Sequence, residues 1–265
     1  MVPSDSGPPS GPAVAPKPIK RSKIRAYWRF LIFFLVTGYW AVRYTLFGIF
    51  KGFNAIDGSD HGHRWSKHLA RAVGMKLHVS GKVPTEPCLL VSNHQSYMDV
   101  TSIFATIPAA FMAKIEVSRW PFIGYVTRLG PTIWIDRSSE ESRRASRDAI
   151  RQRVIEERVP AMVFAEGTRN SGPELLPFKP GSFSMAHEAG IPVVPIAVHY
   201  RDQDDVWAKG AHSFVAHMIR QLGKKEIHVD LVFGDPIDKP TVDETVQAAE
   251  HFVRDELARL RAEHA

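Results

Sequence analysis

The fold is decided by a short apolar run that passes directly into a polar turn: Cys88-Leu89-Leu90-Val91-Ser92-Asn93-His94-Gln95-Ser96-Tyr97-Met98-Asp99. Such a short apolar run, bounded by polar residues, is typical of a buried strand. His94 follows the end of that strand, and α/β proteins place their ligands at the carboxyl edge of the sheet. The stretch therefore predicts both an α/β core and a functional group on it.

Similar runs recur along the chain and alternate with amphipathic stretches, which indicates an α/β fold. The expected strands are Leu77–Ser80, Cys88–Val91, Ala110–Ala113, Thr132–Ile135, Ala161–Ala165, Ile191–Val198 and the alternating residues Ile227, Val229, Leu231 and Phe233, which predict a half-buried strand. The run at 191–198 contains Pro192 and Pro195, which are unusual in a central strand. These prolines predict either a stiff apolar wall or an edge strand.

Capping signals mark two helices. Ser138 and Glu141 stand at capping-box spacing, and we expect their helix to run to about Val159. Thr241 and Glu244 repeat the spacing before the last helix. The apolar face of that helix consists of Val242, Val246, Ala249, Val253, Leu257 and Leu260.

Composition excludes several classes of protein. The 265 residues are 44% hydrophobic and 23% charged, which is ordinary for a chain that buries a core and excludes wholesale disorder, a collagen repeat and a polytopic membrane protein. Cys88 is the single cysteine, so an intramolecular disulfide framework and a multi-cysteine zinc site are excluded. Residues 1–51 hold eight basic residues and one acid, although the net charge of the whole chain is +6. The rest of the chain is thus nearly neutral, which argues against a nucleic-acid-binding surface across it.

The N-terminal part differs from the rest in composition. We expect residues 1–18 to be a disordered tail and residues 19–75 to be a basic and hydrophobic membrane-anchoring segment, with an α/β domain over 76–265. The stretch 30–50 would form a helix of about 32 Å, close to the roughly 30 Å hydrocarbon thickness of a bilayer.

Two membrane arrangements fit this segment. A single span would separate the body from the basic cluster, whereas a helix that enters and returns would keep the body on the basic, cytoplasmic side. We favour the returning helical hairpin; a buried amphipathic helix is the alternative. The next stretch, 61–73, is too polar to span and is expected to lie in the interface. Trp65, Leu69 and Val73 would then face lipid, and Arg64, Lys67, His68 and Arg71 would face phosphates.

The chemistry-bearing residues follow the predicted strands. Asp99 lies five positions after His94, where it can accept a hydrogen bond from one imidazole nitrogen and leave the other as a base. If the substrate brings its own hydroxyl, no nucleophilic serine is needed. The alternative is a histidine that caps a helix and an aspartate on its solvated face.

A second group of residues suits an anion. In Glu166-Gly167-Thr168-Arg169, Gly167 permits a tight turn and Arg169 offers a planar fork for phosphate. Glu166 could receive a hydroxyl or hold Arg169. Lys114 and Arg137 each close an apolar run and are further candidate phosphate cations. Local ion pairs and solvation of the sheet edge are the alternatives.

Together and in this order, these signals resemble the glycerolipid acyltransferase family, which includes 1-acyl-sn-glycerol-3-phosphate acyltransferases. The matching parts are His94 with Asp99, the block Lys114-Ile115-Glu116 with Pro121 and Gly124, the motif Glu166-Gly167-Thr168-Arg169, Phe178-Lys179-Pro180-Gly181, and the proline-rich run 191–197. The resemblance spans roughly residues 76–198.

The resemblance implies a mixed α/β sheet flanked by helices, and acyl transfer from acyl-CoA or acyl-carrier protein to the sn-2 hydroxyl of lysophosphatidic acid, giving phosphatidic acid. His94 would be the general base and Asp99 would orient it. The glycerol phosphate would be held by Glu166, Gly167, Thr168 and Arg169, with added charge from Lys114 and Arg137. No metal or bound cofactor is implied. A membrane bilayer is the expected partner, with the catalytic domain on its cytoplasmic face.

Three alternatives stay open. Another acceptor of the same family is the first: glycerol 3-phosphate, a different lysophospholipid or a lyso-aminolipid. A metal-dependent hydrolase is the second, with ligands drawn from His61, His63, His68, His94 and Asp99. The third is a non-enzymatic module that binds membranes or nucleic acid through the basic residues 17–29.

Overall fold

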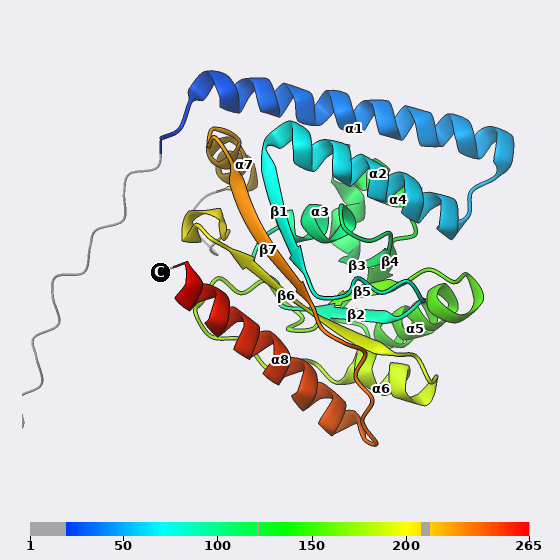
Figure 1. Ribbon diagram of the computed structural model, residues 1–265. Helices are drawn as coiled ribbons and strands as arrows, with labels where there is room; N and C mark the ends of the chain where they lie inside the picture. Colours follow the sequence, from blue (N-terminus) through cyan, green and yellow to red (C-terminus); the bar gives the residue numbers. More distant parts are fainter. Residues whose placement is uncertain (1–19, 121, 208–212, 265) are drawn as a thin grey trace, which may run out of the picture.

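The central feature of the computed structural model is one twisted sheet (Figure 1). The structure describes residues 20–264 except 121 and 208–212, so the expected tail over 1–18 lies outside it. Within the described residues, seven strands have the order β1-β7-β6-β2-β5-β3-β4. Their bounds are β1 Met75–Ser80, β2 Leu89–Ser92, β3 Ala110–Lys114, β4 Ile133–Ile135, β5 Ala161–Phe164, β6 Val193–Tyr200 and β7 Ile227–Phe233. Neighbours are parallel except β6 and β7, which are antiparallel, so the predicted mixed sheet is confirmed.

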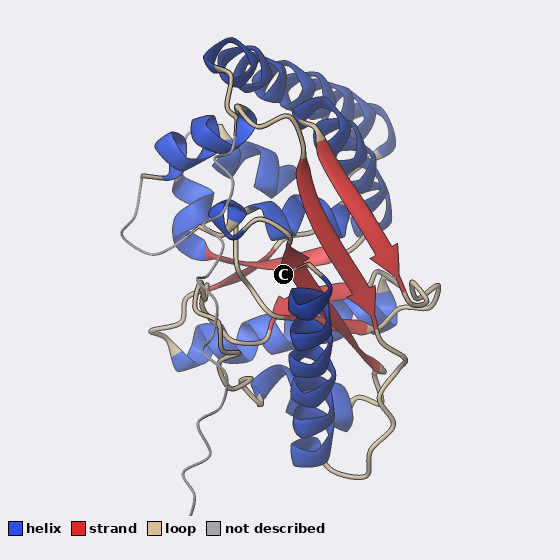
Figure 2. Cartoon of the chain, turned by 60° about the vertical axis from the view of Figure 1, so that its left-hand side comes forward, coloured by secondary structure: helices blue, strands red, loops and turns tan. Residues whose placement is uncertain are grey.

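Helices cover both faces of the sheet (Figures 1 and 2). The helices on one side are α2 Ala55–Val73, α3 Met98–Phe104 and α7 Phe214–Leu222, and those on the other are α5 Glu140–Arg151, α6 Gly181–Glu188 and α8 Val242–Glu263. Leu90 belongs to the core on the first side, while Leu89 and Val91 belong to the core on the second. Because successive strand residues point to opposite faces, both faces of the central strands are buried. This burial also extends to β7, which we expected to be half-buried.

Strand β6 lies in the middle of the sheet, between β7 and β2, so the edge-strand alternative is wrong. Leu89 N donates to Pro192 O at 2.9 Å, and in a parallel ladder alternate residues face the neighbour. The nitrogen of Pro195 therefore points away from β2 and toward β7. The ladder between β6 and β7 begins only at the next residue, Ile196. Gly234 N still donates to Pro195 O at 2.9 Å, so only the return hydrogen bond is lost, at the end of the ladder.

The capping signals are right at one helix and misplaced by one residue at the other. Thr241 caps α8 and accepts from Glu244 N at 3.3 Å, as expected. At α5 the cap is Ser139, which accepts from Ser142 N at 3.1 Å. Ser138 instead donates twice to Asp136 Oδ1 in the preceding turn, so it is unavailable as a cap. The helix ends at residue 151 and one π-helical turn, η2 Gln152–Glu156, follows it, short of the expected end.

The N-terminal segment is a helical hairpin. Helix α1, Lys23–Lys51, packs against α2 and also against α7 and α4 Ile123–Leu129. Leu69 and Val73 on α2 are 3% and 6% exposed and belong to the core, so the expectation that they face lipid is wrong. Trp65 likewise packs on that core, and its Nε1 donates to Thr37 Oγ1 at 3.1 Å. These apolar side chains cover one face of the sheet. The sequence of this segment alone does not show that it will cover a sheet rather than contact lipid.

One face of α1 is apolar and exposed. Among the described helices, α1 alone is long and apolar enough to cross a membrane. It nevertheless lies along the body, tied near its start by Ser22 N to Gly223 O at 2.9 Å and near its end by Thr45 Oγ1 to Tyr125 Oη at 2.9 Å. Its outward residues are Ile24, Tyr27, Trp28, Leu31, Leu35, Tyr39, Val42, Leu46, Ile49 and Phe50. If α1 crossed a membrane, the helix would have to break these contacts with the body.

Arg29 fastens α1 to the body, and its loss should destabilise the fold. Its guanidinium donates to Lys224 O at 2.7 Å and Lys225 O at 3.0 Å. We expect Arg29→Met to lower the free energy of unfolding by about 1–3 kcal/mol because these carbonyls lose a charged donor. The exposed Arg144 on α5 is the matched control, and Arg144→Met should stay within about 0.5 kcal/mol. Denaturation in detergent micelles measures both, and equal effects would contradict the fastening role.

Candidate active site

His94, in the turn after β2, meets Asp99 in the first turn of α3. His94 Nδ1 lies 2.8 Å from Asp99 Oδ2, and the same oxygen accepts from Gln95 N at 2.7 Å and Ser96 N at 2.9 Å. The imidazole stacks on Phe164 with ring centroids 3.9 Å apart. The His94 side chain is 21% exposed, whereas the Asp99 side chain is fully buried. An imidazole that donates from Nδ1 carries its lone pair on Nε2, so this geometry suits a base oriented by a carboxylate.

Two buried side chains tie this turn to β6, and sequence reasoning missed the role of both. Tyr200 Oη donates to Asp99 Oδ1 at 2.6 Å. Burial, and then the charge of Asp99, raises the pKa of the Tyr200 phenol well above its usual value, so the hydroxyl keeps its proton. Asn93 spans the two strands, donating to Val198 O and accepting from Val198 N, both at 2.9 Å. Polar residues next to buried runs, at the same carboxyl edge as His94, were the available signal.

Glu166 holds the His94 turn from its other side. Its Oε1 accepts from His94 N at 2.8 Å, and its Oε2 accepts from Asn170 Nδ2 at 3.0 Å and Leu176 N at 3.1 Å. Glu166 is 3% exposed. Burial raises the pKa of its carboxyl above the usual value, and these hydrogen bonds oppose the rise. Both oxygens are thus engaged by the protein itself, which gives Glu166 a positioning role in this geometry.

The remaining predicted residues follow neighbouring strands at the same edge of the sheet. Gly167 has a φ of 69°, the left-handed conformation that a glycine permits, and its carbonyl accepts from the Arg137 guanidinium. Thr168 is exposed in the same turn. Lys114 is the last residue of β3 and is also exposed. It pairs with Ile135 of β4, and Arg137 follows Ile135 by two residues. Pro121 of the same motif lies outside the described residues.

Arg169 lies beside the His94 turn and stacks on an aromatic ring that the sequence did not single out. Its Cζ is 3.7 Å from the centroid of the Trp207 ring. Burial lowers the pKa of the Arg169 guanidinium, and the negative charge of Asp99 opposes that effect. Asn170, the next residue, donates from its backbone N to His94 O at 2.7 Å. This main-chain hydrogen bond therefore places the Arg169 guanidinium next to the His94 turn.

The histidines proposed as metal ligands lie on separate partners. Among the described residues, no group of three or more His, Cys, Asp or Glu is placed to hold a metal ion. His61 Nδ1 lies 2.8 Å from Asp57 O, and His63 Nδ1 lies 2.6 Å from Phe104 O. His68 Nδ1 accepts from Trp40 Nε1 at 3.1 Å. The His61 contact lies within α2, whereas those of His63 and His68 join α2 to α3 and α1, and none of the three involves His94.

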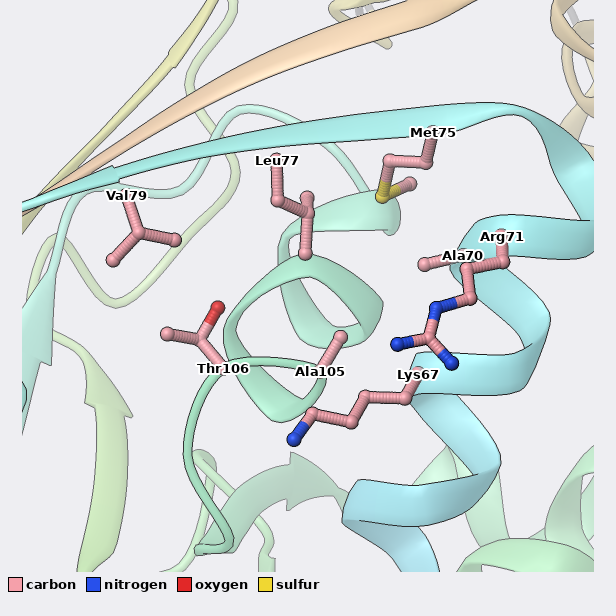
Figure 3. Close-up of a pocket in the computed structure, with 8 residues that line it drawn as sticks. All are labelled: Lys67, Ala70, Arg71, Met75, Leu77, Val79, Ala105 and Thr106. Atoms are coloured by element: carbon pink, nitrogen blue, oxygen red, sulfur yellow. The ribbon is translucent and has the colours of Figure 1, made fainter.

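A separate cavity of about 350 Å³ opens between α2, β1 and the end of α3 (Figure 3). Its lining is Lys67, Ala70, Arg71, Met75, Leu77, Val79, Ala105 and Thr106. Lys67 and Arg71 extend from α2 beside an otherwise largely apolar surface. None of the predicted site residues lines this cavity, and the expectation that these two cations face lipid phosphates stays a prediction.

Comparison with known proteins identifies the family. The sequence model described as acyltransferase matches residues 75–199. A lyso-ornithine lipid O-acyltransferase of Pseudomonas aeruginosa is 32% identical over 199 residues, which cover 72% of this chain and 75% of that protein. The chain belongs to the glycerolipid acyltransferase family. Membership in this family confirms the reaction class, acyl transfer, that the ordered motifs implied.

Other similar proteins agree with this acyltransferase assignment and differ in acceptor. Human 1-acyl-sn-glycerol-3-phosphate acyltransferase alpha is 33% identical over 51% of this chain and 50% of its own length. The crystal structure of the 1-acyl-sn-glycerophosphate (LPA) acyltransferase PlsC from Thermotoga maritima aligns with a TM-score of 0.66, covering 91% of this chain and 98% of that one. At 22% sequence identity this likeness shows that the two share a fold.

Removing the Tyr200 hydroxyl tests its support of Asp99. Tyr200→Phe should lower kcat about tenfold, or about 1.4 kcal/mol, because a buried carboxylate oxygen loses a donor and Asp99 orients His94 less firmly. Tyr97→Phe is the matched control, since the Tyr97 hydroxyl lies 3.3 Å from His217 Nδ1 instead. Steady-state acyl transfer by the two purified variants gives the comparison. A Tyr200→Phe enzyme with unchanged kcat would leave the contact without a catalytic consequence.

Proposed function

We propose that this acyltransferase moves a fatty acyl group from acyl-CoA or acyl-carrier protein to the sn-2 hydroxyl of 1-acyl-sn-glycerol 3-phosphate, giving phosphatidic acid. The observation that carries the proposal is the buried Asp99 on one nitrogen of a partly exposed His94, with the Arg169 cation beside the same turn. A base next to a cation suits a hydroxyl acceptor that bears an anionic headgroup.

In the proposed reaction, His94 Nε2 takes the proton of the acceptor hydroxyl as its oxygen attacks the thioester carbonyl carbon. Asp99 holds the ring and stabilises the imidazolium that forms. The tetrahedral intermediate then collapses, the carbon–sulfur bond breaks, and the imidazolium returns its proton to the leaving thiolate. The products are the ester and the free thiol, and the enzyme regains its starting protonation.

The headgroup site is proposed at the carboxyl edge of β3, β4 and β5. Arg169 would contact the phosphate directly, with Lys114 and Arg137 adding positive charge and Gly167 and Thr168 shaping the turn. Glu166 would act on the substrate through the His94 turn rather than by direct contact, since its oxygens are already bonded within the protein.

A lyso-ornithine lipid is the second candidate acceptor. It is favoured by the P. aeruginosa relative, whose similarity covers a larger share of this chain than that of the human enzyme. Its free hydroxyl would meet the same base, and its carboxylate would meet the same cationic fork. Both acceptors therefore use one chemistry and differ in the anion that Arg169 binds.

Membrane association through α1 completes the proposal. The acceptor is an amphiphile that resides in a bilayer, and the exposed apolar face of α1 with the basic residues before it fits that surface. We propose that the helix lies in the membrane interface with the body on the cytoplasmic side.

Replacing the base tests the reaction. His94→Ala should lower turnover by about 10²–10⁴ while the protein stays folded, because the hydroxyl loses its proton acceptor. His187→Ala, an exposed histidine on α6, should retain activity. Labelled acyl-CoA and acyl-carrier protein would each be offered with lysophosphatidic acid, lyso-ornithine lipid, glycerol 3-phosphate, lysophosphatidylcholine and lysophosphatidylethanolamine.

The outcomes of that panel separate the candidates. Transfer to lysophosphatidic acid that depends on His94 supports the proposal. Transfer confined to the lyso-ornithine lipid keeps the chemistry and selects the second acceptor. Full turnover by purified His94→Ala would sink the base assignment.

The membrane role of α1 has its own test. Leu35 and Val42 are each 60% exposed, and Leu35→Glu with Val42→Glu should reduce co-flotation with phosphatidylglycerol and phosphatidylethanolamine vesicles several-fold. Ile155→Glu, an exposed apolar residue after α5, is the control and should float like the wild type. Unchanged flotation of the α1 variant would contradict an interfacial helix.

A further inference from the structure

Two chain segments meet across the His94 turn. From one side, Asn170 N donates to His94 O at 2.7 Å, and from the other, Trp207 N donates to Gln95 O at 3.3 Å. The first segment continues β5 and carries Arg169, while the second continues β6 through the short helix η3 Gln203–Asp205. Both segments are therefore positioned by the same turn that carries the base.

The side chains of these segments stack on each other. The Arg169 guanidinium carbon lies 3.7 Å from the Trp207 ring centroid, closer than the roughly 6 Å limit for a cation–π contact. A guanidinium stacked by its face keeps its N–H groups directed outward along its edge, where they match the oxygens of a phosphate or carboxylate. The stack thus constrains the plane of Arg169 and not only its location.

The Trp207 ring is itself packed among other aromatic side chains. Its centroid lies 5.6 Å from that of Tyr97 and 5.7 Å from that of Phe214, and Tyr97 and Phe214 lie 4.8 Å apart, all in edge-on arrangements. Tyr97 precedes α3 and Phe214 begins α7. Since two separate parts of the chain pack against the indole, its surface is a fixed support for the guanidinium.

We propose that Trp207 is a positioning residue for the acceptor: it holds the plane of Arg169 so that the guanidinium edge binds an oxyanion of the acceptor headgroup beside His94. This inference rests on the proposed role of Arg169 in acceptor binding. The ligand chemistry is a phosphomonoester or a carboxylate on a hydroxyl-bearing lipid. Trp207 lies outside all the motifs that the family resemblance uses, so it extends the headgroup site into the segment after β6.

Kinetics with lysophosphatidic acid and with lyso-ornithine lipid test the proposal. Arg169→Ala should raise the apparent KM for the acceptor. Trp207→Leu should raise the same KM about three- to tenfold, with the donor KM within about twofold, because the fork loses its support. Trp207→Phe keeps a ring that attracts cations less strongly and should fall between Trp207→Leu and the wild type.

The double variant distinguishes positioning from general packing. In the Arg169→Ala background, Trp207→Leu should cause no further rise in acceptor KM, because there is no fork left to hold. Trp120→Leu is the matched control. The Trp120 ring contacts Phe214 in the same aromatic group, with centroids 5.7 Å apart, but it is not the ring on which Arg169 stacks. Its acceptor KM should match that of the wild type.

Each result has one meaning. If Arg169→Ala leaves the acceptor KM unchanged with both lipids, the proposed headgroup role of Arg169 fails. If Arg169→Ala raises it and Trp207→Leu does not, or if the two effects add independently, the positioning role is overturned while the headgroup role stands. Should Trp207→Leu fail to fold, Trp207→Phe is compared in the wild-type and Arg169→Ala backgrounds instead. A twofold or greater rise in acceptor KM that occurs only in the enzyme with Arg169 supports the proposal. Equal acceptor KM values with and without Trp207→Phe reject it. The acceptor whose KM responds identifies phosphate or carboxylate as the bound anion.

Discussion

The rest of the site depends on one buried carboxylate, that of Asp99. An ionised group removed from water is tolerated only when hydrogen bonds replace its hydration. Here the partners are the His94 ring, the backbone of the turn and the Tyr200 hydroxyl. Asp99 itself lies at the start of α3, and its donors come from the turn after β2 and the end of β6, so satisfying the charge fixes these three parts relative to one another.

A second carboxylate completes the frame from the opposite side. Glu166 accepts from the backbone N–H of His94, so the turn is held by Asp99 at the ring and by Glu166 at the main chain. The proposed base, His94, is thus positioned before any substrate arrives, which is the condition for effective proton transfer. Arg169 follows Glu166 by three residues, so the same turn that braces the base also carries the proposed anion-binding fork.

Local patterns predicted the strands to within two residues at each end, and with them the edge at which the polar motifs gather. Short apolar runs signal strands reliably because the signal lies within a few residues. The errors arose where the partner is distant. Leu69 and Val73 were assigned to lipid because the sequence does not say which apolar surface will cover a sheet. Ser138 lost the cap to Ser139 because Asp136 competes for its donors.

The sequence by itself determined the α/β class, and its ordered motifs carried the family resemblance and the prediction of the site residues, because each of these signals lies within a short stretch of the chain. Only the tertiary structure decided that Tyr200 donates to Asp99, that Glu166 braces His94, and that Trp207 stacks on Arg169. It also decided that α1 lies along the body with one apolar face outward. These facts join residues far apart in the chain, and which distant groups satisfy a buried charge or cover an apolar face is settled only when the strands pair and the helices pack.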